Sequence, residues 1–140
     1  MAKALTLACL MAVSSNYQVP LPVMQAILTV EGGKVGTVSQ NTNGSRDMGP
    51  MQINSIWLPE LAAKLGRTEP QVEYALTHDG CFNATVGAWI LSKHIRDTGN
   101  VWRGVARYHS RTPDLGAAYL RRVQVAYVKA FYAHRRARRH

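Results

Sequence analysis

The sequence predicts a single, mostly α-helical domain. Apolar residues recur every three or four positions along most of the chain, and the alternating patterns typical of strands last only a few residues. The 140 residues are 46% hydrophobic and only 18% charged, which is typical of a chain that folds around its own core. We expect this domain to cover residues 1–134 and a basic tail to cover residues 135–140.

The first helix is expected over about residues 3–15, because Pro20 interrupts the helical pattern soon afterwards. The apolar run inside it also resembles the central part of a signal peptide. We favour the helix, which implies that the export signal is absent from this sequence. We expect no membrane span, since no segment has the necessary length.

The second helix is expected from about Leu21 to Glu31. Met24, Ile27 and Glu31 share one face of it because they are three or four positions apart. Two glycines follow, and glycine accepts the left-handed conformation that often ends a helix. Residues 34–47 are rich in Gly, Ser, Thr and Asn, which indicates a loop or a short hairpin.

Several helices follow this loop. A short one is expected in "NSIWLPELAAKLG", and Thr68 with Gln71 has the spacing of a capping box that opens a helix over Glu69–Thr77. The stretch "NATVGAWILSKHIRDTG" predicts a long apolar helix that ends at Gly99, and "VWRGVARY" predicts a brief one. The residues of the long helix expected to face inward are Val86, Trp89 and Ile90.

The last helix is expected to begin at Pro113, which suits the first helical position, with Thr112 as its cap. It should continue to about His134, where a run of arginines begins. The side chains expected to be buried are Tyr119, Val123, Tyr127 and either Ala130 or Phe131.

The chain is strongly basic. Seventeen Lys and Arg residues against eight Asp and Glu give a net charge of +9, which favours an anionic partner such as nucleic acid, an acidic membrane face or an acidic cell-wall polymer. Part of the excess lies in "HRRARRH", residues 134–140, which we interpret as a solvated tail. The two cysteines, Cys9 and Cys81, form either one disulfide in an oxidising compartment or two buried thiols.

Glu31 is the carboxylate most indicative of chemistry. It falls on the apolar face of its helix and at the C-terminal end, where the helix dipole is negative, and both effects disfavour the anion. Desolvation raises the pKa of a glutamate, so that it can hold and deliver a proton at neutral pH. The alternative is a structural carboxylate that caps loop amides or pairs with an arginine such as Arg46.

Asp47 and the motifs that the sequence lacks limit the reactions that the site could carry out. Asp47 is the acid whose loop could fold back over Glu31, and we expect it to hold that loop by accepting hydrogen bonds from backbone amides. Glycoside cleavage usually needs two carboxylates, so a site with one acid must take its second function from the substrate, for example from an acetamido group. The histidines and cysteines lack metal-ligand spacing, and neither a phosphate-binding loop nor a Gly-x-Ser-x-Gly elbow is present. We therefore expect no metal and no cofactor.

The motifs together resemble a known family. "VEGG", "NGSRDMGPMQINS", "GAWIL" and "ARYHSRTP" in this order are similar to the lysozyme-like lytic transglycosylases of the soluble-transglycosylase superfamily, and especially to the small branch attached to secretion and conjugation systems. The resemblance covers nearly the whole chain. It implies a lysozyme-like α+β fold with a substrate cleft and a short hairpin region after the catalytic helix.

The resemblance also implies an activity. Glu31 matches the sole catalytic acid of enzymes that cut the β-1,4 bond between N-acetylmuramic acid and N-acetylglucosamine in peptidoglycan without adding water, forming a 1,6-anhydro sugar. Met51 and Gln52 match a pair that lines the cleft, and Tyr108 matches a tyrosine that contacts the catalytic carboxylate. Within the same matching blocks we assign substrate binding to Ser45, Asn54 and His109 as well.

Two positions depart from the broad family pattern. The usual "YNAG" is "YHSR" here, which places His109 where asparagine is common, and Pro50 replaces a frequent leucine before "MQ". Neither change removes a group that the chemistry needs. The role of His109 stays open.

The resemblance further implies a disulfide between Cys9 and Cys81, since members of this branch carry cysteines at both places. A periplasmic location follows, with peptidoglycan strands and a component of a secretion or conjugation apparatus as partners, and with no nucleic acid. Two alternatives stay open. One is a lysozyme-type hydrolase that uses water activated by Asp47, and the other is a basic module that binds glycan or nucleic acid without turnover.

Overall fold

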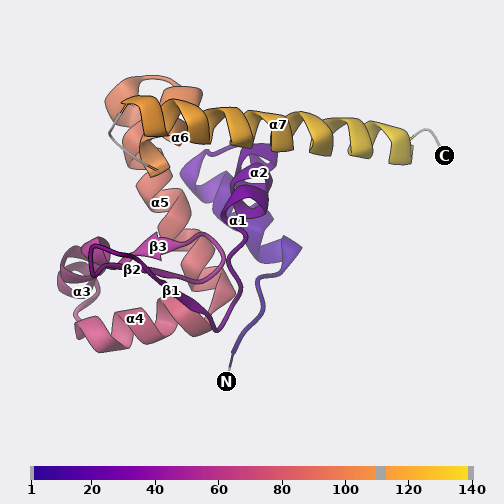
Figure 1. Cartoon of the computed structure of the whole chain (residues 1–140). Helices are drawn as coiled ribbons and strands as arrows, with labels where there is room; N and C mark the ends of the chain where they lie inside the picture. The colour runs from indigo at the N-terminus through magenta and orange to yellow at the C-terminus, as the bar shows by residue number, and fades with distance from the viewer. Residues whose placement is uncertain (1, 110–112, 139–140) are drawn as a thin grey trace. The chain divides into compact units, whose positions relative to one another are not determined.

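The computed structural model describes residues 2–109 and 113–138 (Figure 1). The described chain contains seven α-helices and a small three-stranded sheet, which confirms the mostly α, lysozyme-like fold class. Close backbone contacts divide it into two compact units, Met1–Leu10 with Glu31–Gly87 and Met11–Val30 with Ala88–His140. Within the described residues, no helix has both the length and the hydrophobicity needed to cross a bilayer.

The first unit contains the sheet. Strands β1 (Val38–Gln40) and β2 (Arg46–Met48) form an antiparallel hairpin, which confirms the hairpin expected in this stretch. A third strand, β3 (Ile53–Asn54), pairs with the other side of β2. The sequence did not indicate β3, because two residues are too few to show an alternating pattern.

Two helices of the first unit have the signals read from the sequence. After a short 3-10 turn (η1, Ser55–Trp57), helix α3 covers Leu58–Leu65 and ends at Gly66, whose φ is +62°. Helix α4 covers Glu69–His78. Its capping box is confirmed, because the backbone N–H of Gln71 donates to Thr68 Oγ1 at 3.2 Å and the backbone N–H of Thr68 donates to Gln71 Oε1 at 3.0 Å.

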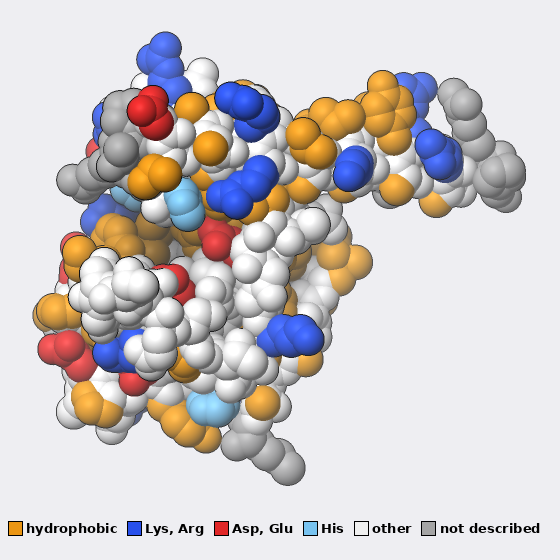
Figure 2. Space-filling view, viewed as in Figure 1, with side chains coloured by type: hydrophobic (Ala, Val, Ile, Leu, Met, Phe, Trp, Pro, Cys, Tyr) orange, Lys and Arg blue, Asp and Glu red, His pale blue; other side chains and the backbone are white. Residues whose placement is uncertain are grey.

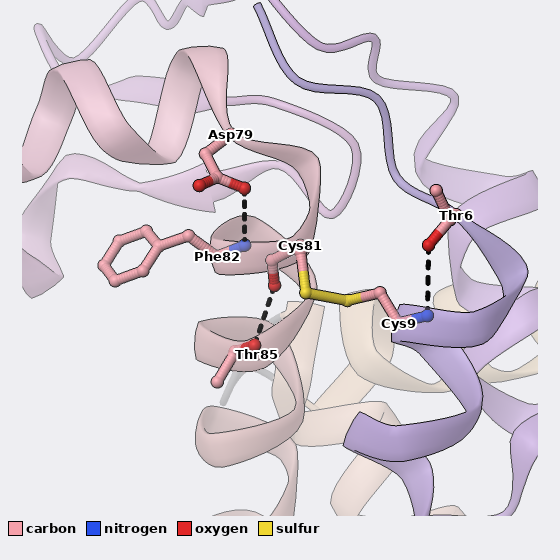
Figure 3. Close-up of a disulfide and its surroundings, with 6 residues drawn as sticks. All are labelled: Thr6, Cys9, Asp79, Cys81, Phe82 and Thr85. Atoms are coloured by element: carbon pink, nitrogen blue, oxygen red, sulfur yellow. Dashed lines mark hydrogen bonds between the residues drawn. A yellow bond between two sulfur atoms is a disulfide. The ribbon is translucent and has the colours of Figure 1, made fainter.

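The predicted disulfide is present between Cys9 and Cys81, whose Cα atoms are 5.9 Å apart (Figure 3). It joins helix α1 (Leu7–Tyr17) to helix α5 (Gly80–Thr98). The expectation that α1 begins near residue 3 is wrong. Lys3 instead pairs its backbone with the junction between α4 and α5. Its N–H donates to the His78 carbonyl at 2.7 Å, and its carbonyl accepts from the Gly80 N–H at 2.8 Å.

Helix α2 covers Leu21–Glu31, and all of it except Glu31 belongs to the second unit. This unit also contains the C-terminal part of α5, α6 (Val101–His109) and α7 (Pro113–Arg138). The bounds predicted for α2 are confirmed. Met24 and Ile27 of α2 are fully buried, as is Val123 of α7. In α5, Ile90 is buried but Trp89 is only half-buried, with the Lys93 ammonium 4.6 Å from its ring centre.

The end of α7 differs from the expectation. Tyr119 is buried as expected, but Tyr127 is half-buried and Ala130 and Phe131 are exposed. The helix also continues to Arg138 instead of ending at His134, because Ala and Arg favour helix and no Gly or Pro stops it. The expected cap, Thr112, lies outside the described residues.

Candidate active site

Glu31 is the last residue of α2, and its side chain is partly exposed. Ile27, one turn earlier on the same face, has 0% exposure. The residue after Glu31 is Gly32, which has the left-handed φ of +65° expected of a residue that ends a helix. The sequence therefore placed this carboxylate correctly, at the end of a buried helical face.

The chain after Glu31 is docked on the turn that contains Gln52. A Cβ atom added to Gly33 would lie 2.0 Å from the Gly49 carbonyl oxygen and 2.6 Å from Gln52 Nε2. Only glycine fits at this distance. The backbone two residues beyond the acid is thus held against the Gln52 amide.

Gln52 has an unusual backbone conformation. Its φ is +52°, in the left-handed region that residues other than glycine rarely adopt. Its backbone N–H donates to the Gly49 carbonyl at 3.1 Å, and its side-chain Nε2 donates to the same oxygen at 2.9 Å. Such strain persists only where the surrounding structure enforces it, and it concentrates at functional sites.

Asn83 is the residue that enforces this turn. It lies in α5 with 0% exposure, and its Nδ2 donates to the carbonyls of Met48 at 2.8 Å and Leu76 at 2.9 Å. Its Oδ1 accepts from the Met51 backbone N–H at 2.8 Å. Sequence reasoning missed Asn83. The available signal was an amide at the start of a long apolar helix, and an amide buried there is costly unless it has fixed partners.

Met51 lies beside Gln52 but inside the core. Its exposure is 0%, and a Cβ added to Gly87 of α5 would lie 2.3 Å from its Sδ atom. We expected Met51 to line the cleft. The structure instead gives its side chain a packing role, in which it supports the turn that presents Gln52.

Asp47, Ser45 and Asn54 form one polar network on the sheet. The Asp47 carboxylate accepts from the side-chain amides of Asn41 at 3.0 Å and Asn54 at 2.9 Å. These donors are side chains, so the expectation that Asp47 holds the loop through backbone amides is wrong. Ser45 Oγ accepts from the same two amides at 3.0 and 3.1 Å and donates to Asn43 Oδ1 at 2.7 Å. Ser45 and Asn54, which we assigned to substrate binding, therefore form hydrogen bonds within the sheet. Contact of these two residues with a ligand stays a prediction.

Arg46 is the arginine that the structural alternative pairs with Glu31. Its guanidinium instead forms an ion pair with Glu73 of α4, in which Nε donates to Oε1 at 2.8 Å. The backbone N–H of Arg46 donates to Ser55 Oγ at 3.0 Å. Arg46 therefore joins the sheet to α4 in the first unit.

Tyr108 and His109 end helix α6 in the second unit. Tyr108 is half-buried, and its contact with Glu31 stays a prediction. His109 is exposed and stacks on the buried ring of Tyr119, with ring centres 4.6 Å apart and planes 10° apart. The Arg122 guanidinium lies 5.9 Å from the centre of the same Tyr119 ring. His109 is thus part of an aromatic and cationic stack.

The described residues contain no group of three or more His, Cys, Asp or Glu side chains that could hold a metal ion. The groups described around the first-unit part of the site include the carboxylate of Glu31 and the side-chain amide of Gln52. Glu31 can exchange a proton, while Gln52, fixed by its backbone, can donate or accept hydrogen bonds.

Comparisons with known proteins agree with these motifs. Residues 8–131 match the family described as the transglycosylase SLT domain. The chain is 31% identical to "Invasion protein IagB" of Salmonella typhimurium over 126 residues, which cover 86% of this chain and 76% of that protein. It is also 31% identical to "Protein IpgF" of Shigella flexneri over 98 residues, which cover 69% of this chain and 61% of that protein.

Proposed function

Because the chain belongs to the transglycosylase SLT domain family, we propose that it is a peptidoglycan lytic transglycosylase with Glu31 as its single general acid and base. It cleaves the β-1,4 bond between N-acetylmuramic acid and N-acetylglucosamine. One observation carries this proposal. Glu31 is the last residue of α2, on the same face as the fully buried Ile27, and the chain that follows it packs against Gln52 at Gly33.

One carboxylate suffices if the substrate supplies the other groups. Protonated Glu31 donates its proton to the glycosidic oxygen, and the C1–O4 bond breaks. The 2-acetamido group of the muramic residue stabilises the positive charge that develops at C1. The resulting Glu31 carboxylate then takes the proton of the 6-hydroxyl as O6 bonds to C1. The product is a 1,6-anhydro sugar, and no water is consumed.

The geometry around Gln52 supports a positioning role for this residue. An intramolecular attack needs the sugar to be held in one orientation, and well-oriented reactions of this kind gain large effective concentrations. A side chain on a strained, fully braced backbone loses little further freedom when it binds. Gln52 therefore presents a rigid amide to the sugar that lies over Glu31.

A lysozyme-type hydrolase would need a second carboxylate to activate water, and Asp47 is the candidate. Both of its oxygens already accept hydrogen bonds from the side-chain amides of Asn41 and Asn54. This arrangement favours a structural role for Asp47. Because the Asp47 oxygens are engaged in these hydrogen bonds, they are poorly suited to activate water, which favours transglycosylation over hydrolysis.

We also propose a periplasmic location and a task in local opening of the cell wall for a secretion or conjugation apparatus. The disulfide between Cys9 and Cys81 supports an oxidising compartment, which peptidoglycan shares. One relative carries the name of an invasion protein, which supports a link to an envelope-spanning apparatus.

Mass spectrometry of digested peptidoglycan tests the activity. The wild-type chain should release muropeptides with anhydro ends, which are one water lighter than hydrolytic ends. Glu31→Gln keeps the shape of the side chain but removes the proton donor, and we expect product release to fall by roughly 1000-fold or more. Glu69→Gln, an exposed acid at the start of α4, should act like wild type. Hydrolytic ends from the wild-type chain would contradict the proposal.

A further inference from the structure

Helix α7 of the second unit has a line of exposed apolar side chains. The exposed fractions are 50% for Val125, 48% for Val128, 51% for Phe131 and 57% for Tyr132. Val128 is three positions from Val125 and from Phe131, and four from Tyr132, so these side chains are neighbours on the helix surface. We call these four residues the α7 stripe. Single exposed apolar residues are common, whereas a continuous line of them indicates a surface that binds something.

The α7 stripe faces away from the core of its unit. Tyr119 and Val123 of the same helix are buried, with exposed fractions of 1% and 0%. Because an α-helix has about 3.6 residues per turn, Val125, Val128 and Tyr132 point to the side opposite these two. The packing of the second unit therefore does not account for the α7 stripe.

Cationic side chains surround the α7 stripe. The exposed Lys and Arg residues that lie three or four positions from one of its members are Arg121, Arg122, Lys129, Arg135 and Arg136. The Arg135 guanidinium lies 5.8 Å from the centre of the Phe131 ring. The sequence of α7 contains one acid, Asp114, which is in its first turn. Figure 2 shows Lys and Arg side chains gathered with hydrophobic side chains along this helix.

The combination of apolar and cationic groups on one face suits the surface of a bilayer that contains anionic lipids. Apolar side chains of such a helix enter the boundary of the acyl chains, while Arg and Lys side chains reach back to the lipid phosphates. Tyrosine is favourable there because its ring is apolar and its hydroxyl is polar. A nucleic acid would also attract the cations, but its phosphate backbone offers no apolar surface to Val125 and Val128.

The arrangement of the cations also favours a flat surface. Arg121 and Arg135 continue the line of the α7 stripe at its two ends, and Lys129 and Arg136 lie beside it. The helix rises by about 1.5 Å per residue, so these charges are spread over roughly 22 Å. A flat anionic surface can contact both ends and the side of the α7 stripe at the same time.

We propose that the α7 stripe and the cations around it bind the surface of a membrane that contains anionic phospholipids. Helix α7 lies along this surface, with the α7 stripe facing the acyl chains. The proposal goes beyond the activity proposed for Glu31, because it concerns the place where the chain works and not the bond that it cuts.

Sedimentation of the full chain with lipid vesicles tests the charges. Wild type should bind vesicles of phosphatidylcholine mixed with phosphatidylglycerol, and it should stay in solution with vesicles of phosphatidylcholine alone. Each cation near an anionic surface strengthens binding by about fivefold, so Arg121→Gln combined with Lys129→Gln should weaken it by about 25-fold. Arg103→Gln combined with Arg107→Gln removes the same charge from exposed positions of α6 and should change binding by less than about twofold.

Phe131→Ser tests the apolar contact in the same assay. It should weaken binding to the mixed vesicles by about tenfold, because the ring no longer leaves water on binding. Ile56→Ser is the matched control, since Ile56 of the first unit is 77% exposed and lies outside the α7 stripe, and it should bind like wild type.

Two results would overturn the proposal. One is a wild-type chain that does not bind the mixed vesicles, as expected if the α7 stripe binds an acidic protein or a nucleic acid. The other is equal binding by Phe131→Ser and Ile56→Ser, because charge alone would then hold the chain at the surface. Neither result would affect the proposed function, since binding is measured without cleavage of peptidoglycan.

Discussion

Asn83 accepts a hydrogen bond from the backbone N–H of Met51 at 2.8 Å, across 32 positions of sequence. The same amide donates to the carbonyls of Met48 and Leu76. One buried side chain of α5 thus satisfies two backbone groups around the turn that presents Gln52 and a third near the end of α4. Buried polar groups of this kind are costly to leave without partners, so the turn depends on Asn83.

Replacement of Asn83 by alanine should therefore destabilise the protein by about 3 kcal/mol, because it removes three hydrogen bonds and leaves buried backbone groups unpaired. Urea unfolding measures this change. Asn16→Ala, which alters an exposed asparagine of α1, should change the free energy of unfolding by less than about 0.5 kcal/mol. Equal stability of the two variants would show that the Asn83 bonds contribute nothing.

The missed role of Asn83 illustrates what local sequence signals could not provide. The bounds of α2 and the capping box at Thr68 were predictable, because the responsible residues lie within a few positions of one another. The partners of Asn83 lie seven to 35 positions away, and no local pattern encodes such a contact. The amide donors of Asp47 were missed for the same reason, since Asn41 and Asn54 meet it only after the sheet has formed.

In the candidate site, too, some features could be predicted from the sequence and others could not. The position of Glu31 followed from a helical pattern that ends at a glycine pair, which is a local signal. The burial of Met51 could not be predicted in this way, because it depends on the lack of a side chain at Gly87, 36 positions later. A residue beside a ligand-facing neighbour can equally point into the core, and sequence spacing alone does not distinguish the two.

Gly33 offers a second test, this time of the docking of the chain beyond Glu31. A methyl group at Gly33 would collide with the backbone oxygen of Gly49, which cannot move as a flexible side chain can. Gly33→Ala should destabilise the protein by about 2 to 3 kcal/mol and lower kcat/KM, because Gly49 and Gln52 are displaced from the acid.

Gly32→Ala is the matched control for this substitution. Gly32 has a positive φ of +65°, but among the described residues a Cβ added there would have no atom within 4 Å apart from those of its chain neighbours. Its replacement should therefore cost only the backbone strain of about 1 kcal/mol. Thermal unfolding of both variants gives the comparison. If Gly33→Ala were the milder of the two, the close approach to Gly49 would be refuted.

The disulfide predicts a dependence of stability on reduction. Cys9 and Cys81 are 72 positions apart, and a cross-link over such a loop stabilises the folded state by about 4 kcal/mol in the chain-entropy model. Dithiothreitol should thus lower the urea midpoint of the wild-type protein. The double variant Cys9→Ala and Cys81→Ala should have the lower midpoint with or without the reductant. If the urea midpoint of the wild-type protein were the same with and without dithiothreitol, the disulfide would not stabilise the fold.

Gln52 permits a separation of stability from activity. Its φ of +52° is unfavourable for any residue with a Cβ atom but acceptable for glycine. Gln52→Gly should therefore leave the free energy of unfolding within about 1 kcal/mol of the wild-type value, although it removes the bond from Nε2 to the Gly49 carbonyl. Since it also removes the amide that holds the sugar, kcat/KM should fall by roughly 10- to 100-fold.

Gln52→Val is the comparison variant at the same position, and it is expected to lose both properties. A β-branched side chain is a poor fit to the left-handed region, so this variant should lose about 2 kcal/mol of stability as well as activity. Urea unfolding and release of anhydro muropeptides, measured on both variants, give the two readouts. If Gln52→Gly kept full activity, the side-chain amide would have no part in holding the sugar, and the strained backbone at this position would serve the turn alone.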